Sequence, residues 1–119
     1  MHILCIVPEL APFSSVGELG QFCADLPRQL RAGGAEITVV TPFHRVVAPE
    51  RFGIARRIRK LQVTIGDAVE EMGLYDGTFV DCDVPVFFID HPASFDRAGL
   101  YGDESGPYPD NHRRYFTLS

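Results

Sequence analysis

The sequence predicts an α/β fold in which the core strands are parallel and an antiparallel hairpin is added to the sheet. Three observations predict it. An apolar run, an amphipathic helical pattern and a β-branched apolar run follow one another within residues 1–42. Two strand-like segments joined by a Gly-Asp turn then occupy the middle of the chain, and a further apolar run follows at residues 84–89.

A strand–helix–strand unit opens the chain. Residues 3–7 predict a buried strand, Gly33-Gly34 ends the helix that follows, and residues 36–41 predict the second strand. The helix has about four turns, with one apolar stripe to lay on the sheet. The residues of this stripe are Leu19, Phe22, Cys23, Leu26 and Leu30. Because a helical crossover joins parallel strands, we expect these two strands to be parallel and their connection right-handed.

The middle of the chain predicts the antiparallel part. Residues 43–53 show no periodicity and contain proline and glycine breakers, so we expect an irregular connection there. Apolar and polar residues alternate at 61–65, and residues 69–75 predict the returning strand after a Gly66-Asp67 turn. This pattern favours a hairpin or meander appended to the parallel sheet.

The last third predicts one strand, a loop and a short helix. Pro85 has no N–H to give to a sheet, so we expect it near the start of the strand at 84–89 or on an exposed edge. Residues 93–110 have loop composition, and Asp110 is a suitable N-cap for a final helix containing Tyr115. So short a helix is marginal alone, and it must therefore pack on the sheet or on another partner.

Composition indicates one soluble globular domain, residues 1–119, with 45% hydrophobic and 23% charged residues. The net charge of −5 argues against nucleic acid or an anionic membrane as the main partner, and the basic cluster at 56–60 is typical of a solvated face. The first apolar run is too short for a signal peptide or a membrane span, so we expect a cytoplasmic protein.

The cysteines predict neither disulfides nor a metal site. Cys5, Cys23 and Cys82 are odd in number and widely spaced, which is typical of small buried hydrophobic residues in a reducing compartment. Asp81 and Asp83 flank Cys82, yet no further ligand stands at partner spacing. We therefore expect no metal and no cofactor.

The candidate site is the loop between the first strand and the first helix. Gly17 and Gly20 bracket the start of that helix, where free backbone N–H groups and the helix dipole favour a phosphate or sugar ligand. Glu9 and His91 each follow the carboxyl end of a predicted strand and are candidate cleft contacts. The alternatives are a packing role for the glycines, a solvated Glu9 and a structural His91.

Several motifs resemble those of one family. The loop matches the pattern E-x-A-P-F-x-K-T-G-G-L-G-D at Glu9, Ala11-Pro12-Phe13, Gly17 and Leu19-Gly20. Further matches follow in the family's order: Thr41 to Arg45, Val84 to Pro92, Phe95-Asp96-Arg97, Gly99 to Asp103 and Tyr108 to Asn111. On these residues the chain resembles the N-terminal domain of bacterial glycogen synthases and plant starch synthases, which are retaining glucosyltransferases of the GT-B architecture.

The resemblance implies a Rossmann-like partial N-terminal half of a two-domain enzyme. Full-length members move glucose from ADP-glucose to the end of an α-1,4-glucan, and most of the nucleotide contacts lie in their C-terminal half. The donor and acceptor cleft is implied to include Tyr101 and, in the loop, Ser15, Val16, Gly17, Glu18 and Gly20. The chain is truncated relative to the family, so we expect no glucosyl transfer by these 119 residues alone.

The loop departs from the family's pattern at four positions. Ser15 stands where the family has a lysine that reaches the donor phosphates, and Val16, Glu18 and Gln21 replace a threonine, a glycine and an aspartate. A charge-assisted hydrogen bond is worth roughly 1.5–3 kcal/mol, so loss of the lysine alone implies about ten- to hundredfold weaker phosphate binding. Any ADP-glucose or α-glucan is expected to bind weakly.

Two functions follow from these residues. The first is a glycogen- or starch-synthase-like glucosyltransferase module that is inactive in isolation. The second is a degenerate pseudoenzyme that keeps the fold as a non-catalytic interaction or dimerisation domain. A truncated α/β domain exposes a sheet edge and apolar surface, which favour a homodimer or a protein partner.

Overall fold

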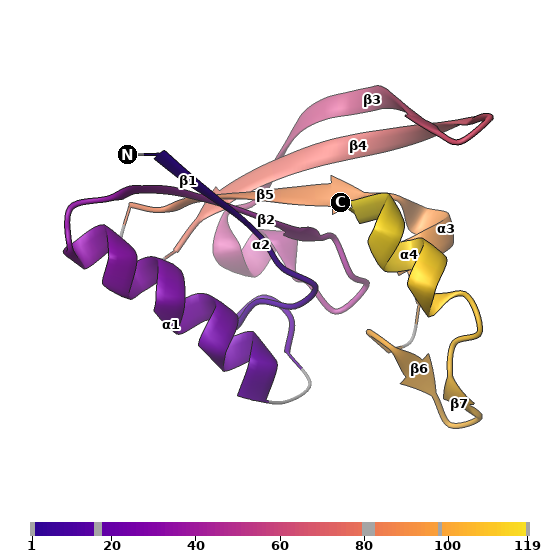
Figure 1. The fold of residues 1–119 in the computed structure, drawn as a ribbon, viewed down its shortest axis with the longest axis horizontal. Helices are drawn as coiled ribbons and strands as arrows, with labels where there is room; N and C mark the ends of the chain where they lie inside the picture. The colour runs from indigo at the N-terminus through magenta and orange to yellow at the C-terminus, as the bar shows by residue number, and fades with distance from the viewer. Residues whose placement is uncertain (1, 16–17, 80–82, 98, 119) are drawn as a thin grey trace.

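A five-stranded sheet with the order β1-β2-β5-β4-β3 runs through the molecule (Figure 1). The computed structural model describes residues 2–15, 18–79, 83–97 and 99–118. The strands of the sheet are β1 (His2–Ile6), β2 (Glu36–Pro42), β3 (Ala55–Ile65), β4 (Ala68–Thr78) and β5 (Pro85–Asp90). The helices are α1 (Glu18–Ala32), α2 (Pro49–Phe52), α3 (Pro92–Phe95) and α4 (Asn111–Leu118), and β6 (Gly102–Asp103) pairs with β7 (Gly106–Pro107).

The pairing of the strands confirms the predicted fold class. β1 and β2 are parallel, with Leu4 beside Thr38 and Ile6 beside Val40, and β5 continues the parallel sheet on the other side of β2. β4 then runs antiparallel to both β5 and β3. The fold is therefore a parallel core with an appended antiparallel hairpin, as the sequence predicts.

Proline accounts for the main local differences between prediction and structure. The segments expected to be irregular contain the short helices α2 and α3, each of which begins with a proline. Proline suits the first helical position, because its fixed φ is helical and its missing N–H would be unpaired there anyway. Pro85 lies at the first residue of β5, which is a central strand, so the edge alternative is wrong.

The core lies on one face of the sheet. Val39, Val86 and Phe88 are fully buried there. Phe13, from the loop after β1, packs edge-on against Phe52 of α2 and Phe88 of β5, with ring centroids 4.8 and 5.2 Å apart. The loop that carries the candidate site is therefore anchored in the core.

The predicted contact face of α1 is wrong at three of its five positions, Leu19, Phe22 and Leu26. The side of α1 that is buried carries Gly20, Cys23, Ala24 and Pro27, whereas Phe22, for example, is 63% exposed. Small side chains let the helix axis approach the sheet closely, which turns the bulky residues Leu19, Phe22 and Leu26 onto one flank of the helix. Of the predicted stripe, Cys23 is buried and Leu30 packs at the margin of the core.

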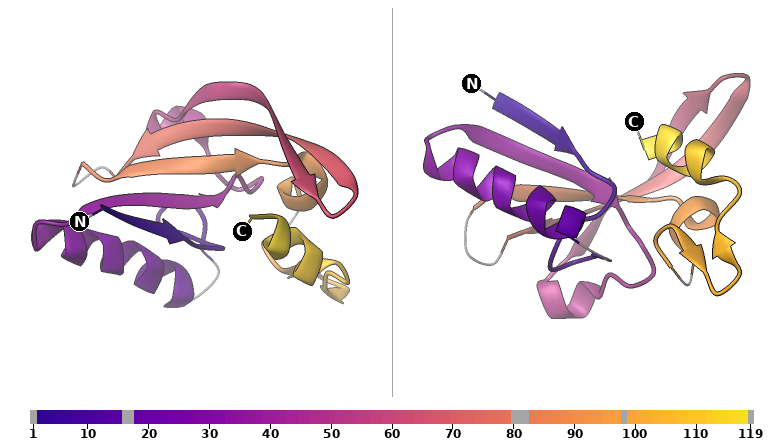
Figure 2. Two further views of the ribbon diagram at one scale, coloured as in Figure 1. Left: turned by 45° about the horizontal axis from the view of Figure 1, so that its top comes forward. Right: turned by 60° about the horizontal axis from the view of Figure 1, so that its bottom comes forward.

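The C-terminal segment lies beyond the carboxyl ends of the parallel strands. Figure 2 shows α4 and the β6–β7 hairpin at that end of the sheet, away from α1. As predicted, α4 begins directly after Asp110, whose carbonyl oxygen accepts the N–H groups of Arg113 and Arg114. In the described part of the chain, the helices lack the length and apolar character needed to cross a membrane.

Candidate functional site

Glu9 lies buried at the amino end of α1. Its side chain is 1% exposed, and its Oε1 atom accepts the backbone N–H of Gly20 at 2.7 Å. Gly20 is in the first turn of α1, where backbone N–H groups lack helical partners and an anion is favoured. The chain's own carboxylate therefore takes part of the position that an external anion would use.

Gly20 is required by this close packing. A Cβ atom at Gly20 would overlap the Oγ of Ser15 and would lie 2.8 Å from Oε1 of Glu9. Contacts that short do not occur between a real Cβ and its neighbours. The glycine therefore serves a close approach of the loop to the helix, which is the packing role that the sequence left open for it.

The first half of the loop is held by backbone hydrogen bonds and burial. The backbones of Leu10 and Ser14 exchange two hydrogen bonds of 2.7 Å, and both residues are buried together with Phe13. The N–H of Ala11 donates to the carbonyl oxygen of Gly20 at 3.1 Å. The Leu10–Ser14 bonds close the loop on itself, and the Ala11 bond ties it to the first turn of α1.

Tyr101 completes the environment of Glu9 from a distant part of the sequence. Its hydroxyl donates to Oε2 of Glu9 at 2.6 Å, and its carbonyl oxygen accepts the Nδ2 amide of Asn111 at 2.7 Å. Burial, together with the hydrogen bond to Glu9, raises the pKa of Tyr101 far above its usual value. Tyr101 is therefore a fixed hydrogen-bond donor at neutral pH and not a base.

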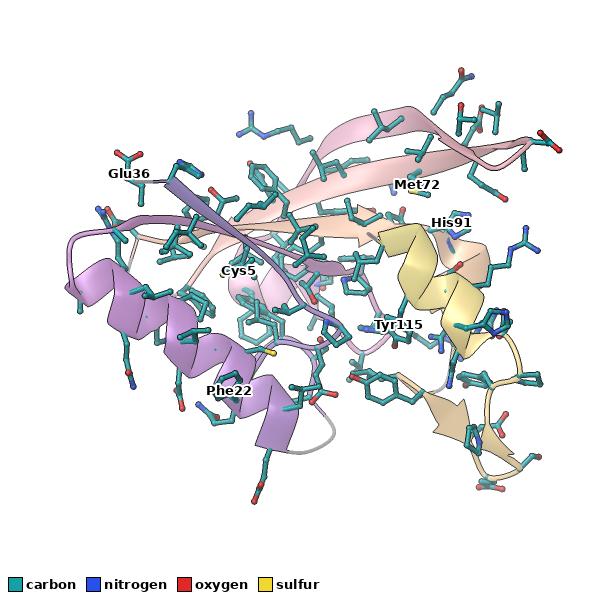
Figure 3. The ribbon with its side chains drawn as sticks, in the orientation of Figure 1. Cys5, Phe22, Glu36, Met72, His91 and Tyr115 are labelled. Carbon is teal, nitrogen blue, oxygen red and sulfur yellow. The ribbon has the colours of Figure 1, made fainter. Side chains whose placement is uncertain are left out.

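Tyr115 of α4 packs beside Tyr101, with ring centroids 5.5 Å apart. Its hydroxyl donates to the carbonyl oxygen of Leu100 at 2.6 Å, and burial raises its pKa to about 12. The two tyrosines thus join α4 to the loop after β1. Figure 3 labels Tyr115 on α4, between that helix and the sheet.

His44 and Arg114 contact the residues next to Glu9 and Tyr101. The Nε2 atom of His44 is 2.9 Å from the carbonyl oxygen of Pro8, and burial lowers the pKa of this imidazole. A neutral ring that donates through Nε2 fits both facts. Arg114 is completely buried: Nη1 donates to Asn111, Nε donates to the carbonyl oxygen of Ser94, and its guanidinium lies 4.9 Å from the Tyr108 ring.

Sequence reasoning missed the roles of His44 and Arg114. Both stand in or beside segments that carry the family resemblance, and that is their only trace in the sequence. Arginine and histidine are usually exposed, so no local sequence pattern predicts that these two residues are buried. The Nδ1 atom of His44 and Nη2 of Arg114 have no hydrogen-bond partner among the described residues.

The predicted site residues fall into three groups. Glu9, Gly20 and Tyr101 are brought together, with the exposed Ser15 against Gly20 and the exposed Glu18 at the first residue of α1. Val16 and Gly17 lie outside the described residues.

His91 lies in a different place. It precedes α3, with Nδ1 2.7 Å from Oγ of Ser94 and Nε2 3.3 Å from Oε2 of Glu70. With Arg97 and Arg113 it lines a cavity of about 250 Å³.

The arrangement is suited to binding more than to catalysis by its own residues. The Glu9 carboxylate already accepts two short hydrogen bonds, so it is not free to act as a base. Across the described residues, no group of three or more histidine, cysteine or acidic side chains could hold a metal ion. The loop therefore presents a ligand with backbone, hydroxyl and carboxylate groups, which together form one wall.

Comparison with known proteins identifies the family. The family described as "Starch synthase catalytic domain" matches residues 2–119. The chain belongs to this family. A glycogen synthase of Geotalea uraniireducens (strain Rf4) is 37% identical over 115 residues, which are 97% of this chain and 23% of that protein. A glycogen synthase of Anaeromyxobacter dehalogenans (strain 2CP-C) is 38% identical over 120 residues, covering 100% of this chain and 24% of its own length.

A solved structure shares the fold. The catalytic domain of Starch Synthase IV from Arabidopsis thaliana, bound to ADP and acarbose, superposes with a TM-score of 0.82 at 24% identity. The match covers 98% of this chain and 23% of that one, which confirms the expected partial half of a GT-B fold. The chain thus spans about a quarter of the length of the proteins it matches.

Proposed function

We propose that this chain is the N-terminal module of a glycogen- or starch-synthase-like enzyme that moves glucose from ADP-glucose to an α-1,4-glucan, and that the 119 residues do not catalyse this reaction alone. The observation that carries the proposal is the 2.6 Å bond between Tyr101 and Glu9, 92 residues apart. It joins two of the family's motifs into one wall at the carboxyl end of β1, where ligands bind in open α/β sheets.

In this proposal the wall contributes to the cleft through residues 15–20 and Tyr101. Ser15 and Glu18 are exposed at the start of α1, where they can meet a ligand, and Val16 and Gly17 are assigned by the resemblance. The Arabidopsis structure holds ADP and acarbose, which supports a nucleotide and an oligosaccharide as the ligand classes. Because the family's lysine is replaced by Ser15 and Glu9 engages the N–H of Gly20, a diphosphate is held weakly here.

Calorimetric titration with ADP-glucose and with maltooligosaccharides at millimolar concentration tests this function. We expect weak heats for the chain as it stands, and Ser15→Lys should tighten ADP-glucose binding about ten- to hundredfold by returning the charge-assisted bond. Ser105→Lys is the matched control, because it adds the same charge at an exposed turn of the β6–β7 hairpin. Absence of heat with both ligands, in the chain and in Ser15→Lys, would contradict the proposal.

A second candidate is a non-catalytic interaction or dimerisation domain built on the same fold. The observation that favours it is exposed apolar surface on β1 and α1, including Leu4 at 56% and Phe22 at 63%. This function predicts self-association, which light scattering at high protein concentration measures. A strictly monomeric protein that binds glucan would eliminate it.

The cysteines support a cytoplasmic location of the protein for either function. Cys5 and Cys23 are free thiols, and burial raises the pKa of both. Protonated, buried thiols oxidise slowly, and such cysteines are typical of proteins in a reducing compartment.

A further inference from the structure

The cavity beside His91 is lined by more positive than negative side chains. Its volume is about 250 Å³, and its lining comes from β4, α3 and α4. Figure 3 labels His91 at this place, close to α4. The charged residues of the lining are Arg97, Arg113, Arg114, Glu70 and Asp110, and the remaining residues are His91 and Ser94. Three guanidinium groups therefore face two carboxylates.

Arg114 lines the deepest part of the cavity, since it is completely buried. Its Nε and Nη1 atoms donate to the carbonyl oxygen of Ser94 and to the side-chain oxygen of Asn111, both of which are uncharged. Its Nη2 atom has no hydrogen-bond partner among the described residues. A buried charge without an opposite charge is costly, and an anion in the cavity would reduce that cost.

Arg97 brings a second positive charge close to the first. The guanidinium groups of Arg97 and Arg114 lie 5.0 and 4.9 Å from the centre of the same ring, that of Tyr108. Burial lowers the pKa of Arg114, and the charge of Arg97 acts in the same direction. Asp110 accepts two hydrogen bonds of 2.7 Å from Arg97 and so balances one of these two charges. The deep end of the cavity consequently stays positive.

Arg113 stands at the mouth of the cavity, where its side chain is 70% exposed. Its Nη2 atom is 3.9 Å from Oε1 of Glu70, and an ion pair so long and so exposed is weak. Glu70 is shared with His91, whose Nε2 atom lies 3.3 Å from Oε2. An entering anion can therefore take the place of Glu70 beside Arg113 without breaking a short bond between the two residues.

We propose that this cavity binds one phosphate group, as the free ion or as a phosphate monoester. Arginine suits this ligand, because its planar group offers paired N–H donors that match the oxygens of a phosphate. The ligand would lie above Arg114 and would meet Arg113 at the mouth. Pockets for drug-sized ligands have about 300–1,000 Å³, so a cavity of about 250 Å³ suits a smaller molecule.

The phosphate site is separate from the wall proposed for ADP-glucose and does not rest on that function. The described residues of the loop after β1 do not line the cavity, and neither does Tyr101. A carboxylate has one charge and two oxygens, so it would engage fewer of the N–H donors than a phosphate does. We therefore expect phosphate to bind more tightly than acetate.

Titration of the 119-residue chain with inorganic phosphate at constant ionic strength tests the site. We expect a dissociation constant of about 1 mM or lower, with the NMR shift changes centred on the amides of Ser94 and Arg114. Phosphate at ten times this constant should raise the melting temperature by at least about 3 °C. Shift changes centred on Gly20, or no binding at about 10 mM, would overturn the proposal.

Arg113→Gln tests the mouth of the cavity with little risk to folding, because the side chain is exposed. Loss of this guanidinium should weaken phosphate binding at least about tenfold. Arg57→Gln is the matched control, since Arg57 is 63% exposed, is bonded to Asp76 at 2.7 Å and lies outside the lining. Equal weakening by the two variants would mean that phosphate responds to net charge alone, and the site would not exist.

Glu70→Gln should have the opposite effect. The amide keeps the shape of the side chain and removes the carboxylate that competes for Arg113, so phosphate should bind at least about threefold more tightly. Glu71→Gln makes the same change of charge at the next residue of β4, which is exposed and outside the lining. A merely structural role of the cluster predicts no gain in Glu70→Gln, and an equal gain in Glu71→Gln would also reject the site.

Methyl phosphate distinguishes the two sources of the phosphate group. Binding of both probes would assign the cavity to a phosphate monoester, and binding of inorganic phosphate alone would assign it to the free ion. Acetate that binds as tightly as phosphate would overturn the choice of ligand. Phosphate binding at Ser94 and Arg114 in a chain that gives no heat with ADP-glucose or maltooligosaccharides would refute the proposed function and leave this site standing.

Discussion

The two ends of the sheet carry similar polar side chains in opposite environments. At the carboxyl end, Glu9 and Arg114 are buried within hydrogen-bond networks. At the amino end, His2 and Glu36 approach to 3.5 Å, and Arg31 meets Asp83 at 3.1 Å, in pairs that are largely exposed. Carboxylates, imidazoles and guanidinium groups occur at both ends, and the two pairs named at the amino end are the ones open to solvent.

The difference shows where polar contacts determine the structure. A buried charge without its partners costs several kcal/mol, whereas an exposed ion pair contributes little because water and salt replace it. The cavity of about 220 Å³ at the amino end, lined by His2, Arg31 and Asp83 among others, is thus bordered by weak pairs. At the carboxyl end, the buried hydrogen-bond networks fix the positions of the side chains. Four measurements test this contrast between the two ends.

The largest effect is expected at Arg114. Arg114→Ala should lower the free energy of unfolding by about 3–5 kcal/mol, because it leaves buried acceptors on Ser94 and Asn111 without their donor. The neighbouring Arg113→Ala is the control, since the Arg113 side chain is 70% exposed, and it should cost no more than about 1 kcal/mol. Urea denaturation measures both. Equal losses would mean that burial does not distinguish the two arginines.

A smaller effect is expected at Tyr101. Tyr101→Phe removes the hydroxyl that donates to buried Glu9, so the free energy of unfolding should fall by about 1.5–3 kcal/mol. Tyr108→Phe removes a neutral hydrogen bond from the N–H of Gly99, at 3.2 Å, and should cost about 0.5–1.5 kcal/mol. If Tyr108→Phe proved the more damaging change, the Glu9–Tyr101 bond would not be the link we describe.

His44 should make stability depend on pH. Burial lowers the pKa of His44 in the folded protein, whereas the unfolded residue takes up a proton near about 6.5. The stabilising contribution is therefore complete above about pH 6.5 and is lost as the pH falls toward the folded pKa, with a slope of at most about 1.4 kcal/mol per pH unit. Denaturation midpoints between about pH 5 and 8 measure this slope.

Two variants test the assignment of this slope. His44→Gln should remove it, and His2→Gln should leave it unchanged because His2 is exposed at the amino end. A slope that survives in His44→Gln would assign the effect to another group.

The smallest effect is expected at the Arg31–Asp83 pair. Arg31→Gln should change the unfolding midpoint less than Arg114→Ala or Tyr101→Phe, and added salt should erase the remaining difference. The Arg31 guanidinium holds the pKa of Asp83 below its usual range, so the variant should let that pKa rise, which NMR titration measures. A loss of stability as large as that of Tyr101→Phe would break the contrast between the two ends.

The fold was largely predictable because its patterns are local. The apolar runs at residues 3–7 and 36–41, with a helical period between them, identify a strand–helix–strand unit without knowledge of contacts. The orientation of α1 was not predictable in this way. It depends on how closely Gly20 and Ala24 let the helix approach β2, which is a property of packing.

The candidate site was predictable only in part. The loop was placed correctly because it follows a strand and precedes a helix, and Tyr101 entered through the family resemblance. The contact between Tyr101 and Glu9 depends on the path of 92 residues, and nothing local specifies it. Nor does the pattern around Arg114 reveal that this residue is buried, since its neighbour Arg113 has the same side chain and is exposed.

Gly20 limits how the loop could be re-engineered. A library aimed at restoring donor binding would vary Ser15 and Glu18, which are exposed near the start of α1. Position 20 would have to stay constant in that library, because any side chain there would displace the neighbouring hydroxyl and carboxylate oxygens. Phosphate binding would therefore be restored by changing the charge of these side chains while the backbone stays as it is.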